Sequence, residues 1–268
     1  MVDFTKKDEY NIVDLLEIMA LLRQPGGCPW DAEQTHESIR RNFIEEAYEA
    51  VEAIDEKDPV HLCEELGDVL MQVMFHAGIE EDAGRFDLNG VADMAVKKLI
   101  LRHPHVFGDK TVSGSDEVLK NWDEIKRVEK SQRTVSDSMV SVAKSLPSLW
   151  RAEKIQNKAS KVGFDWPDAD GAMDKLAEEL AELSDAMNHG GSVEEELGDL
   201  LFSAVNVARL SGIDPETALH AACDKFTARF SIMEKAAETS GRRLEDMSLP
   251  EMDRLYDDAK AALSADAE

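Results

Sequence analysis

Apolar residues recur three and four positions apart along most of the chain, and strict alternation of apolar and polar residues is hard to find. Such spacing places the apolar side chains on one face of an α-helix, whereas a strand would alternate them. The pattern therefore predicts an all-α protein. Helices are expected at residues 8–23, 35–56, 60–82, 88–102, 116–132, 147–161, 171–188, 193–210, 215–239 and 250–263.

Residues that start and stop helices support these boundaries. Pro25-Gly26-Gly27 follows the first predicted helix, and Gly190-Gly191 follows another. Asp58-Pro59 and Asp214-Pro215 each combine a capping side chain with a proline at the first helical position. The long helices are therefore expected to be joined by short turns.

Length and a change in composition predict two domains. The chain has 268 residues, and a typical domain has about 150. Between residues 110 and 146 serine becomes frequent around a charged helical piece, which is typical of a connecting segment. We expect an N-terminal domain at 1–110, a partly helical linker at 111–146 and a C-terminal domain at 147–268.

The charge balance narrows the classes of partner. The chain has 30 Lys and Arg against 56 Asp and Glu, a net charge of −26, which repels nucleic-acid phosphates and anionic membranes. No apolar run approaches the ~18 residues of a membrane span, and the first residues lack the pattern of a secretion signal. We therefore expect a cytoplasmic protein with neither nucleic acid nor membrane as a partner. The three cysteines, Cys28, Cys63 and Cys223, are expected to be unpaired and mostly buried.

The two halves carry the same acidic pattern. Glu-Glu-x-x-Glu at 45–49 is followed by Glu-Glu-Leu-Gly-Asp at 64–68, and the same two patterns stand at 178–182 and 195–199. A basic Lys-x-x-x-Arg pattern then follows in each half, as Lys98 with Arg102 and as Lys225 with Arg229. Three matching elements in the same order indicate a tandem repeat.

The acidic pattern predicts a metal site. Positions three apart lie on one helical face, so Glu179 pairs with Glu182 and Glu196 pairs with Asp199. Two such helices side by side would bring four carboxylates together, and a cation would have to compensate their charge. Oxygen ligands suit Mg²⁺ or Mn²⁺. The second candidate metal site, in the N-terminal half, consists of Glu46, Glu49, Glu65 and Asp68.

Two alternatives stay open for these acids. In so acidic a chain, a Glu-x-x-Glu pattern also fits a helix face that is simply hydrated. A ferritin-type di-iron site would need two Glu-x-x-His elements, and only Glu33 with His36 fits.

Gly67 and Gly198, each inside a predicted helix, indicate the close approach of another backbone or a ligand. His103-Pro104-His105 is expected to form a structured loop.

The basic pairs fit phosphate binding. Lys225 and Arg229 lie four apart on one face, and ammonium and guanidinium groups both bind phosphate oxygens. Taken alone, each pair also fits a charged helix surface. Its recurrence in both halves favours a function.

Several separated motifs together resemble one family. Beside the acidic patterns, the chain has Gly-Cys-Pro-Trp-Asp at 27–31 and His-Pro-His-Val-Phe-Gly-Asp at 103–109. These resemble the MazG family of tandem-repeat nucleoside triphosphate pyrophosphohydrolases, from about residue 12 to about residue 258. The resemblance implies two α-helical MazG domains, a homodimer, and Mg²⁺-dependent hydrolysis of nucleoside triphosphates to monophosphate and pyrophosphate.

The resemblance also implies which half of the chain contains the main catalytic site. Lys175 stands one turn before Glu179, whereas the matching position in the first half is Asn42. The family pattern places the main catalytic site in the C-terminal repeat. By resemblance its metal ligands are Glu179, Glu182, Glu196 and Asp199, its phosphate contacts are Lys175, Lys225 and Arg229, and Tyr256 stands where the family pattern has a base-contacting Trp.

The chemistry of the reaction leaves two points open. Mg²⁺ would neutralise the triphosphate and orient a water, with Glu178 or another of these acids as candidate general base. A different class of function also fits, namely a helical nucleotide-binding or regulatory module without turnover, and the N-terminal repeat in particular fits such a role.

Overall fold

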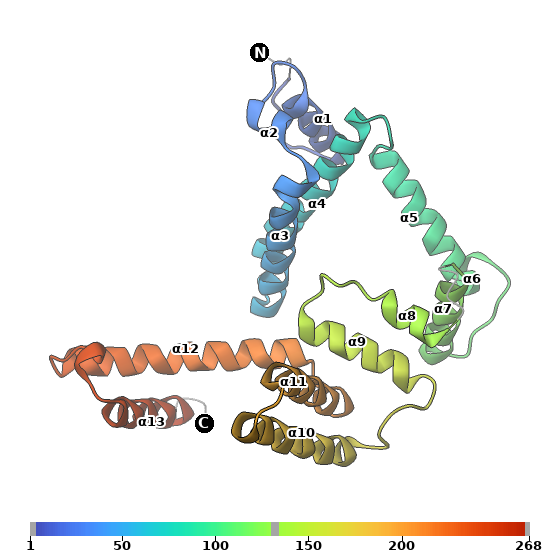
Figure 1. Cartoon of the computed structure of the whole chain (residues 1–268). Helices are drawn as coiled ribbons and strands as arrows, with labels where there is room; N and C mark the ends of the chain where they lie inside the picture. The colour runs from blue at the N-terminus through green and yellow to red at the C-terminus, as the bar shows by residue number, and fades with distance from the viewer. Residues whose placement is uncertain (1–3, 130–133, 266–268) are drawn as a thin grey trace. The chain divides into compact units, whose positions relative to one another are not determined.

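The structure is a computed structural model that describes residues 4–129 and 134–265. Within these ranges all regular secondary structure is helical, which confirms the predicted fold class (Figure 1). The elements are α1 (Ile12–Arg23), α2 (Pro29–Glu33), α3 (His36–Glu56), α4 (Pro59–Asp82), α5 (Leu88–Arg102), α6 (Pro104–Phe107), α7 (Ser115–Glu129), α8 (Val135–Val140), α9 (Ser148–Ser160), α10 (Ala169–His189), α11 (Val193–Leu210), α12 (Pro215–Thr239), the 3₁₀ helix η1 (Leu244–Asp246) and α13 (Leu249–Ala265).

The chain forms two compact units that divide between Lys126 and Arg127. This division falls inside the segment 111–146 that the sequence predicts as the linker. Each unit is built around a hairpin of two long helices, α3 with α4 in the first and α10 with α11 in the second. The repeated acidic patterns lie on these two hairpins.

The N-terminal hairpin turns within two residues. Lys57 adopts the left-handed conformation with φ 58°, and the Asp58 side chain then accepts hydrogen bonds from the first backbone N–H groups of α4. So short a connection forces the two helices to run antiparallel. Helix α1 packs on α4, and the core between the helices is formed by Met19, Ile39, Met74 and Phe75.

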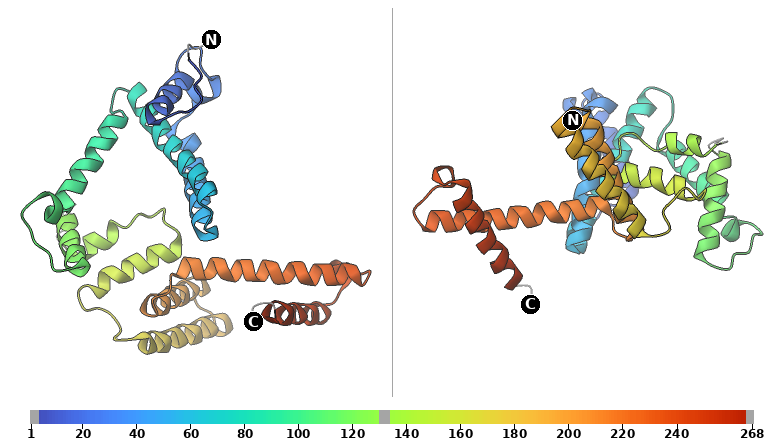
Figure 2. Two further views of the ribbon diagram at one scale, coloured as in Figure 1. Left: turned by 180° about the vertical axis from the view of Figure 1, so that it is seen from behind. Right: turned by 60° about the horizontal axis from the view of Figure 1, so that its bottom comes forward.

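The C-terminal hairpin turns at Gly190-Gly191, and Ser192 caps α11. Helix α9 packs against α11. Helix α12 runs on beyond the α10/α11 hairpin, and α13 folds back beside it (Figures 1 and 2). Trp150 of α9 donates its indole N–H to Asp214, the cap of α12, at 3.0 Å, and this bond fixes the start of that helix.

Most predicted helices are present, but several ends differ. The first begins at Ile12 instead of residue 8, because the Asn11 side chain caps the Val13 and Asp14 N–H groups and Asp14 returns a bond to the Asn11 N–H. The short helices α2, α6 and α8 were not predicted, since they are too short to show a periodicity. Helix α6 replaces the loop expected at 103–105, and Pro104 is its first residue. Residues 130–132 of the predicted helix 116–132 lie outside the described ranges.

The prediction of mostly buried cysteines is wrong. Cys63 and Cys223 are exposed and Cys28 is half-buried. Cys63 and Cys223 lie on outward faces of α4 and α12, in helices whose apolar positions are only partly covered.

Apolar side chains remain exposed along both hairpins. On α11 these include Leu197, Leu201 and Phe202, and on the N-terminal hairpin Ile44, Tyr48, Val51, Leu66 and Met71.

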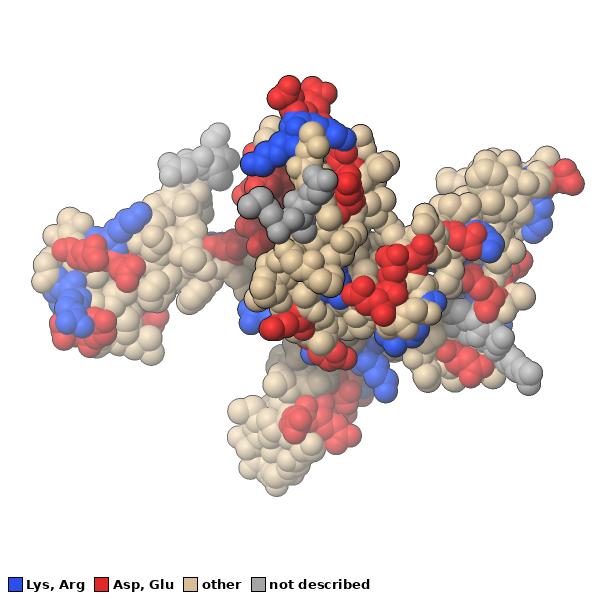
Figure 3. Space-filling view, turned by 90° about the horizontal axis from the view of Figure 1, so that it is seen from above, with Lys and Arg blue, Asp and Glu red and all other residues tan. Residues whose placement is uncertain are grey.

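Acidic side chains gather in several groups on the visible face, with uncharged surface between them (Figure 3). In the described part of the chain, none of the helices has both the length and the apolar character needed to cross a bilayer.

Candidate active site

A cluster of carboxylates bridges the two helices of the C-terminal hairpin. Glu179 on α10 and Glu196 and Asp199 on α11 each offer an oxygen within 4.8 Å of the others. Glu179 is buried, with 6% of its surface exposed, while Glu196 is half-buried and Asp199 is exposed. The hairpin therefore brings three of the four predicted ligands into a geometry that can hold a metal ion.

The fourth predicted ligand, Glu182, lies beside this group. Partial loss of hydration raises the pKa of Glu182, and the carboxylates of Glu179, Glu178 and Glu196 raise it further against the opposing charge of Lys175. Nearby like charges disfavour the ionised form of a carboxyl group, so the raised pKa of Glu182 shows that its carboxylate interacts electrostatically with the cluster.

Lys175 supplies the positive charge of the cluster. Its Nζ lies 2.8 Å from Oε1 of Glu179 and 2.9 Å from Oε1 of Glu178. The bond to Glu179, followed by that to Glu178, raises the pKa of Lys175, so the ammonium group stays charged. About a third of this side chain remains exposed, which leaves the charge accessible to a ligand.

The N-terminal hairpin carries a second cluster of the same kind. Glu46 and Glu49 on α3 and Glu65 on α4 each offer an oxygen within 4.8 Å of the others. Loss of hydration raises the pKa of Glu46, as do the charges of Asp68 and Glu49. Oε2 of Glu65 is buried and has no hydrogen-bond partner among the described residues. This cluster too has oxygens left for a cation.

The two clusters differ in their cationic neighbour. Asn42 occupies the position that corresponds to Lys175, and Glu65 pairs with His61 at 3.2 Å. The hydrogen bond between His61 and the neighbouring acid Glu56 is the main cause of the raised pKa of His61. A histidine charge depends on pH near neutrality, whereas a lysine charge does not.

The remaining predicted residues form a separate group on α12 and α13. The Arg229 guanidinium lies 6.0 Å and the Lys260 ammonium 5.3 Å from the ring centre of Tyr256, and Phe226 packs on the same ring. Lys225 is exposed on α12. Within residues 134–265 no ion pair joins Lys225 or Arg229 to the carboxylates of α10 and α11. Among the described residues these basic groups therefore form no direct ion pair with the acidic cluster.

The di-iron alternative finds no support in the placement of His36. Its Nδ1 lies 2.7 Å from Nδ1 of His76, and its Nε2 lies 2.5 Å from Oε1 of Glu80. Arg85 binds the same carboxylate, and these bonds lower the pKa of Glu80 to about 2. His36 is thus part of a hydrogen-bonded group of its own and is absent from both carboxylate clusters of the described residues.

The helical glycines leave space beside both clusters. A Cβ atom built on Gly67 or Gly198 would meet no atom of the described residues within 4 Å. The close approach expected from these glycines is therefore not made by the chain itself.

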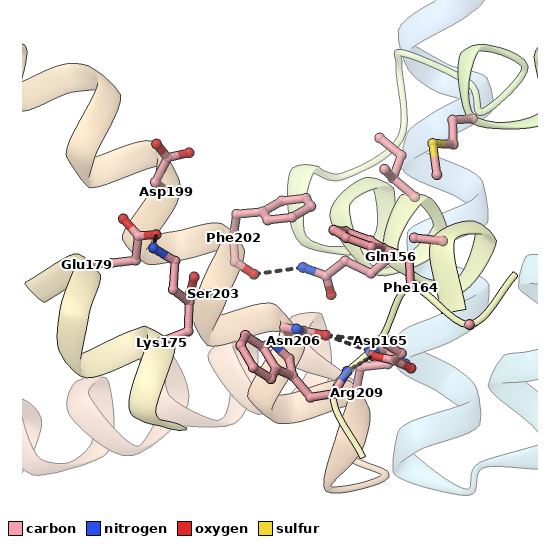
Figure 4. Close-up of a pocket in the computed structure, with 15 residues that line it drawn as sticks. Gln156, Phe164, Asp165, Lys175, Glu179, Asp199, Phe202, Ser203, Asn206 and Arg209 are labelled. Atoms are coloured by element: carbon pink, nitrogen blue, oxygen red, sulfur yellow. Dashed lines mark hydrogen bonds and ion pairs between the residues drawn. The ribbon is translucent and has the colours of Figure 1, made fainter. Parts of the chain in front are cut away.

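A pocket of about 590 Å³ opens beside the C-terminal cluster, between α9, α10 and α11 (Figure 4). Lys175, Glu179 and Asp199 line one side of it. Arg209 of α11 binds Asp165 through two nitrogens, and so fixes the loop that closes the other side. The sequence patterns did not predict this pocket. The recurrence of Gly-x-x-Trp at 27–30 and 163–166, before the acidic helix of each half, is the signal that could have indicated it.

The fold and the two clusters define an all-α protein in which each of two repeated helical hairpins carries a cluster of carboxylates. The MazG nucleotide pyrophosphohydrolase domain matches the chain over residues 34–107 and 169–231, the segments that contain both hairpins. The chain belongs to this family, which confirms the identification made from the sequence motifs.

Similar proteins cover nearly the whole chain. The nucleoside triphosphate pyrophosphohydrolase/pyrophosphatase MazG of Thermotoga maritima is 45% identical over 92% of this chain and 94% of its own. The nucleoside triphosphate pyrophosphohydrolase of Escherichia coli K12 is 41% identical over 92% of this chain and 95% of its own. An uncharacterized Bacillus subtilis protein, YabN, is 48% identical over 91% of this chain but only half of its own length.

Proposed function

We propose that this protein hydrolyses nucleoside triphosphates to nucleoside monophosphates and pyrophosphate, with its main site in the C-terminal repeat. The convergence of Glu179, Glu196 and Asp199 beside Lys175 carries this proposal. The names of the Thermotoga maritima and Escherichia coli relatives support the reaction class.

The donor set of the C-terminal cluster fits Mg²⁺. All its ligand atoms are carboxylate oxygens, the type that Mg²⁺ and Mn²⁺ prefer. Glu179, Glu196 and Asp199 would hold the ion, and we include Glu182 because its carboxylate adjoins theirs. When bound, Mg²⁺ would neutralise charge on the triphosphate and lower the pKa of a bound water.

The residues around the cluster have distinct roles in this proposal. Lys175 would bind phosphate oxygens while it holds the Glu179 carboxylate in place. Glu178 would accept a proton from the attacking water; it lies on the same turn, and Lys175 fixes its Oε1.

Lys225, Arg229 and Tyr256 keep their proposed roles as phosphate and base contacts. They lie on α12 and α13, and Arg229 and Tyr256 contact each other there. We propose a homodimer, in which the exposed apolar faces of the hairpins would pair.

The N-terminal repeat has a second candidate function. Glu46, Glu49, Glu65 and Asp68 would form a further metal site, because Glu65 Oε2 is buried without a partner among the described residues. The absence of a lysine at position 42 favours nucleotide binding or regulation without turnover in this half.

One assay separates these proposals. Pyrophosphate and monophosphate release would be measured on the full chain with Mg²⁺ and a panel of ordinary and damaged nucleoside triphosphates. Asp199→Asn should abolish release, whereas the matched Asp68→Asn in the first repeat should not. Nucleotide binding without release of pyrophosphate would show a binding module instead of an enzyme.

A further inference from the structure

Four polar side chains join the two helices of the N-terminal hairpin at the end opposite its turn. His36 is the first residue of α3, whereas His76 and Glu80 stand one turn apart near the end of α4. Arg85 lies in the loop that follows α4. The turn at Lys57 joins the other ends of the same two helices. We call His36, His76, Glu80 and Arg85 together the histidine clasp.

The two imidazole rings of the clasp meet through like nitrogens. Nδ1 of His36 lies 2.7 Å from Nδ1 of His76, the ring planes differ by 8° and the ring centres are 5.0 Å apart. This nitrogen–nitrogen distance is too short for rings stacked face to face, so the rings lie edge to edge and share an N–H···N hydrogen bond. Because a ring nitrogen donates only when protonated and accepts only when not, the bond holds a single proton.

Glu80 determines the state of the other nitrogen of His36. Nε2 of His36 lies 2.5 Å from Oε1 of Glu80, and Arg85 donates to the same oxygen from Nη2 at 2.8 Å. The bonds from Arg85 and His36 lower the pKa of Glu80 to about 2, so its carboxylate stays ionised down to strongly acidic pH. An ionised carboxylate only accepts hydrogen bonds, and His36 Nε2 must therefore carry a proton.

These bonds limit the number of protons that the closed clasp can hold. One proton sits on His36 Nε2 and one between the two Nδ1 atoms. A third, on Nε2 of His76, gives the pair of rings one positive charge. A fourth would make both rings imidazolium ions, so that N–H would face N–H and the bond between them would be lost. The closed clasp thus accommodates one positive charge on its rings but not two.

The surroundings of His76 oppose its protonation. Burial lowers the pKa of His76 below its ordinary value of 6.5, and the neighbouring His36 lowers it further. On its other side the ring of Phe43 meets the His76 ring edge to face, with 5.6 Å between their centres, and offers no charge. A second positive charge is therefore unfavourable on the rings while the clasp is closed.

Charged groups on the adjacent elements do not offset that second charge. In the described part of the chain, Glu80 is the one acid bonded to either ring, and Glu37 beside His36 on α3 is exposed. Charged residues of the helices packed on α4 have other partners, namely Asp14 with Lys7 and Arg23 with Asp82 for α1, and Asp87 with the N–H of Gly90 for α5. The rings thus depend on Glu80 alone for compensation.

The C-terminal repeat has no such group. Aligned on the acidic patterns, its residues at these positions do not titrate near neutral pH: Ala169, Val207 and Ser211 stand in place of His36, His76 and Glu80. The two repeats share their carboxylate clusters but not the clasp. A proton taken up at the clasp therefore acts on the N-terminal hairpin.

We propose that the histidine clasp is a proton-sensitive latch, which holds the start of α3 against the end of α4 at neutral pH and releases it in acid. Opening takes up one proton from water more than the closed pair can hold. Both rings then become imidazolium ions and the bond between the Nδ1 atoms breaks, while Glu80 keeps its bonds to Arg85. This inference is independent of the proposed reaction.

Hydrogen exchange of the full chain tests the latch. Protection factors, which correct for the intrinsic effect of pH on exchange, are read at residues 36–44 and 76–82. Between pH 7 and pH 5 they should fall roughly tenfold for each pH unit below 6.5, the ordinary histidine pKa, because each opening takes up one proton. Protection around the turn at 57–58 should stay unchanged. Constant protection at the clasp, or an equal loss at both ends of the hairpin, would overturn a local latch.

A variant that cannot titrate should remove the acid step. His76→Asn places an amide near the position of Nδ1, where it can bond to His36 at any pH. Its protection at pH 7 should match that of the unmodified protein and should stay constant down to pH 5. The control is His189→Gln, which removes an exposed histidine paired with Asp185 at 2.7 Å in the other unit and should leave the step unchanged. An acid step that persists in His76→Asn would refute the proposal.

Nuclear magnetic resonance of the imidazole signals needs no folded His76 variant. In the unmodified protein the protonation midpoint of His76 should lie below 6.5. His36→Asn should raise this midpoint, because the neighbouring charge is gone and an amide oxygen can accept the Nδ1 proton of His76. A merely structural role of His36 would not move it. A midpoint at or above 6.5 in the unmodified protein, or one unchanged in His36→Asn, would contradict the latch.

Discussion

Lys175 Nζ lies 2.8 Å from Oε1 of Glu179, one helical turn further along α10, and this ion pair has no counterpart in the first repeat. There Asn42 stands in place of the lysine, and His61, whose charge depends on pH, lies beside Glu65. Each hairpin thus gathers three carboxylates, although the third member is Glu49 in the first and Asp199 in the second, and the two hairpins differ in fixed positive charge.

Loss of one cluster carboxylate should abolish turnover. Asp199→Asn and Glu196→Gln each remove a ligand charge with almost no change in volume, so helical content should stay the same by circular dichroism. We expect pyrophosphate release to fall more than about 100-fold, beyond the typical effect of removing a group that only supports a metal ligand. Unchanged release in both variants would rule out a catalytic metal site at Glu179, Glu196 and Asp199.

Metal removal should act in the same way. A chelator should stop pyrophosphate release, and Mg²⁺ or Mn²⁺ should restore it, because three convergent carboxylates bind such ions in their ionised form. The control is Asp199→Asn, in which added Mg²⁺ should restore little. A protein indifferent to chelator would contradict the metal assignment.

The repeats should differ in their sensitivity to equivalent changes. Glu182→Gln should lower turnover by roughly 10²–10³-fold, whereas the matching Glu49→Gln should have a small effect. Lys175→Asn creates the residue found at position 42 and should weaken both substrate binding and kcat, since it removes charge that faces the phosphates. The opposite result, with Glu49→Gln inactive and Glu182→Gln active, would place the working site in the N-terminal half.

The exposed apolar face of α11 should mediate self-association. Leu201 is 51% exposed between Leu197 and Phe202, and burial of such a face favours pairing of two copies. Light scattering at micromolar concentration should give the mass of a dimer. Leu201→Asp should shift it towards the monomer, while Leu119→Asp on α7 serves as a control with similar exposure. A monomer for the unmodified chain would contradict the proposal.

Acid should loosen the α12–α13 connection through Glu251. Its bond to Arg242 at 2.8 Å, together with two bonds from Ser248, lowers the pKa of Glu251 from 4.5 to about 2. A lowered pKa in the folded state stabilises the protein above the unfolded value, and this contribution disappears as the pH falls from about 4.5 to about 2. In thermal unfolding, Glu251→Gln should cost stability at pH 7 but little near pH 2. A constant difference across this range would show that the ion pair does not contribute.

The sequence alone determined the helices and the acidic faces, because both depend on local geometry. Positions three apart share a helical face whatever the rest of the chain does, so Glu196 and Asp199 could be paired from their spacing. Asp58-Pro59 and Gly190-Gly191 fixed short turns, and a short turn between long helices requires an antiparallel hairpin. The pairing of acidic helices within each repeat followed from these two facts.

The tertiary structure decided which side chains meet across helices. The bond from Gln156 to Phe202 joins residues 46 apart, and that from Arg209 to Asp165 joins residues 44 apart. Such contacts depend on which face of α9 lies against α11. That face is set by many small packing contacts acting together, and no local sequence pattern specifies it. The placement of Arg229 and Lys260 over the Tyr256 ring was decided in the same way. Spacing along the chain orders residues on one helix, but only packing sets the distance between two helices.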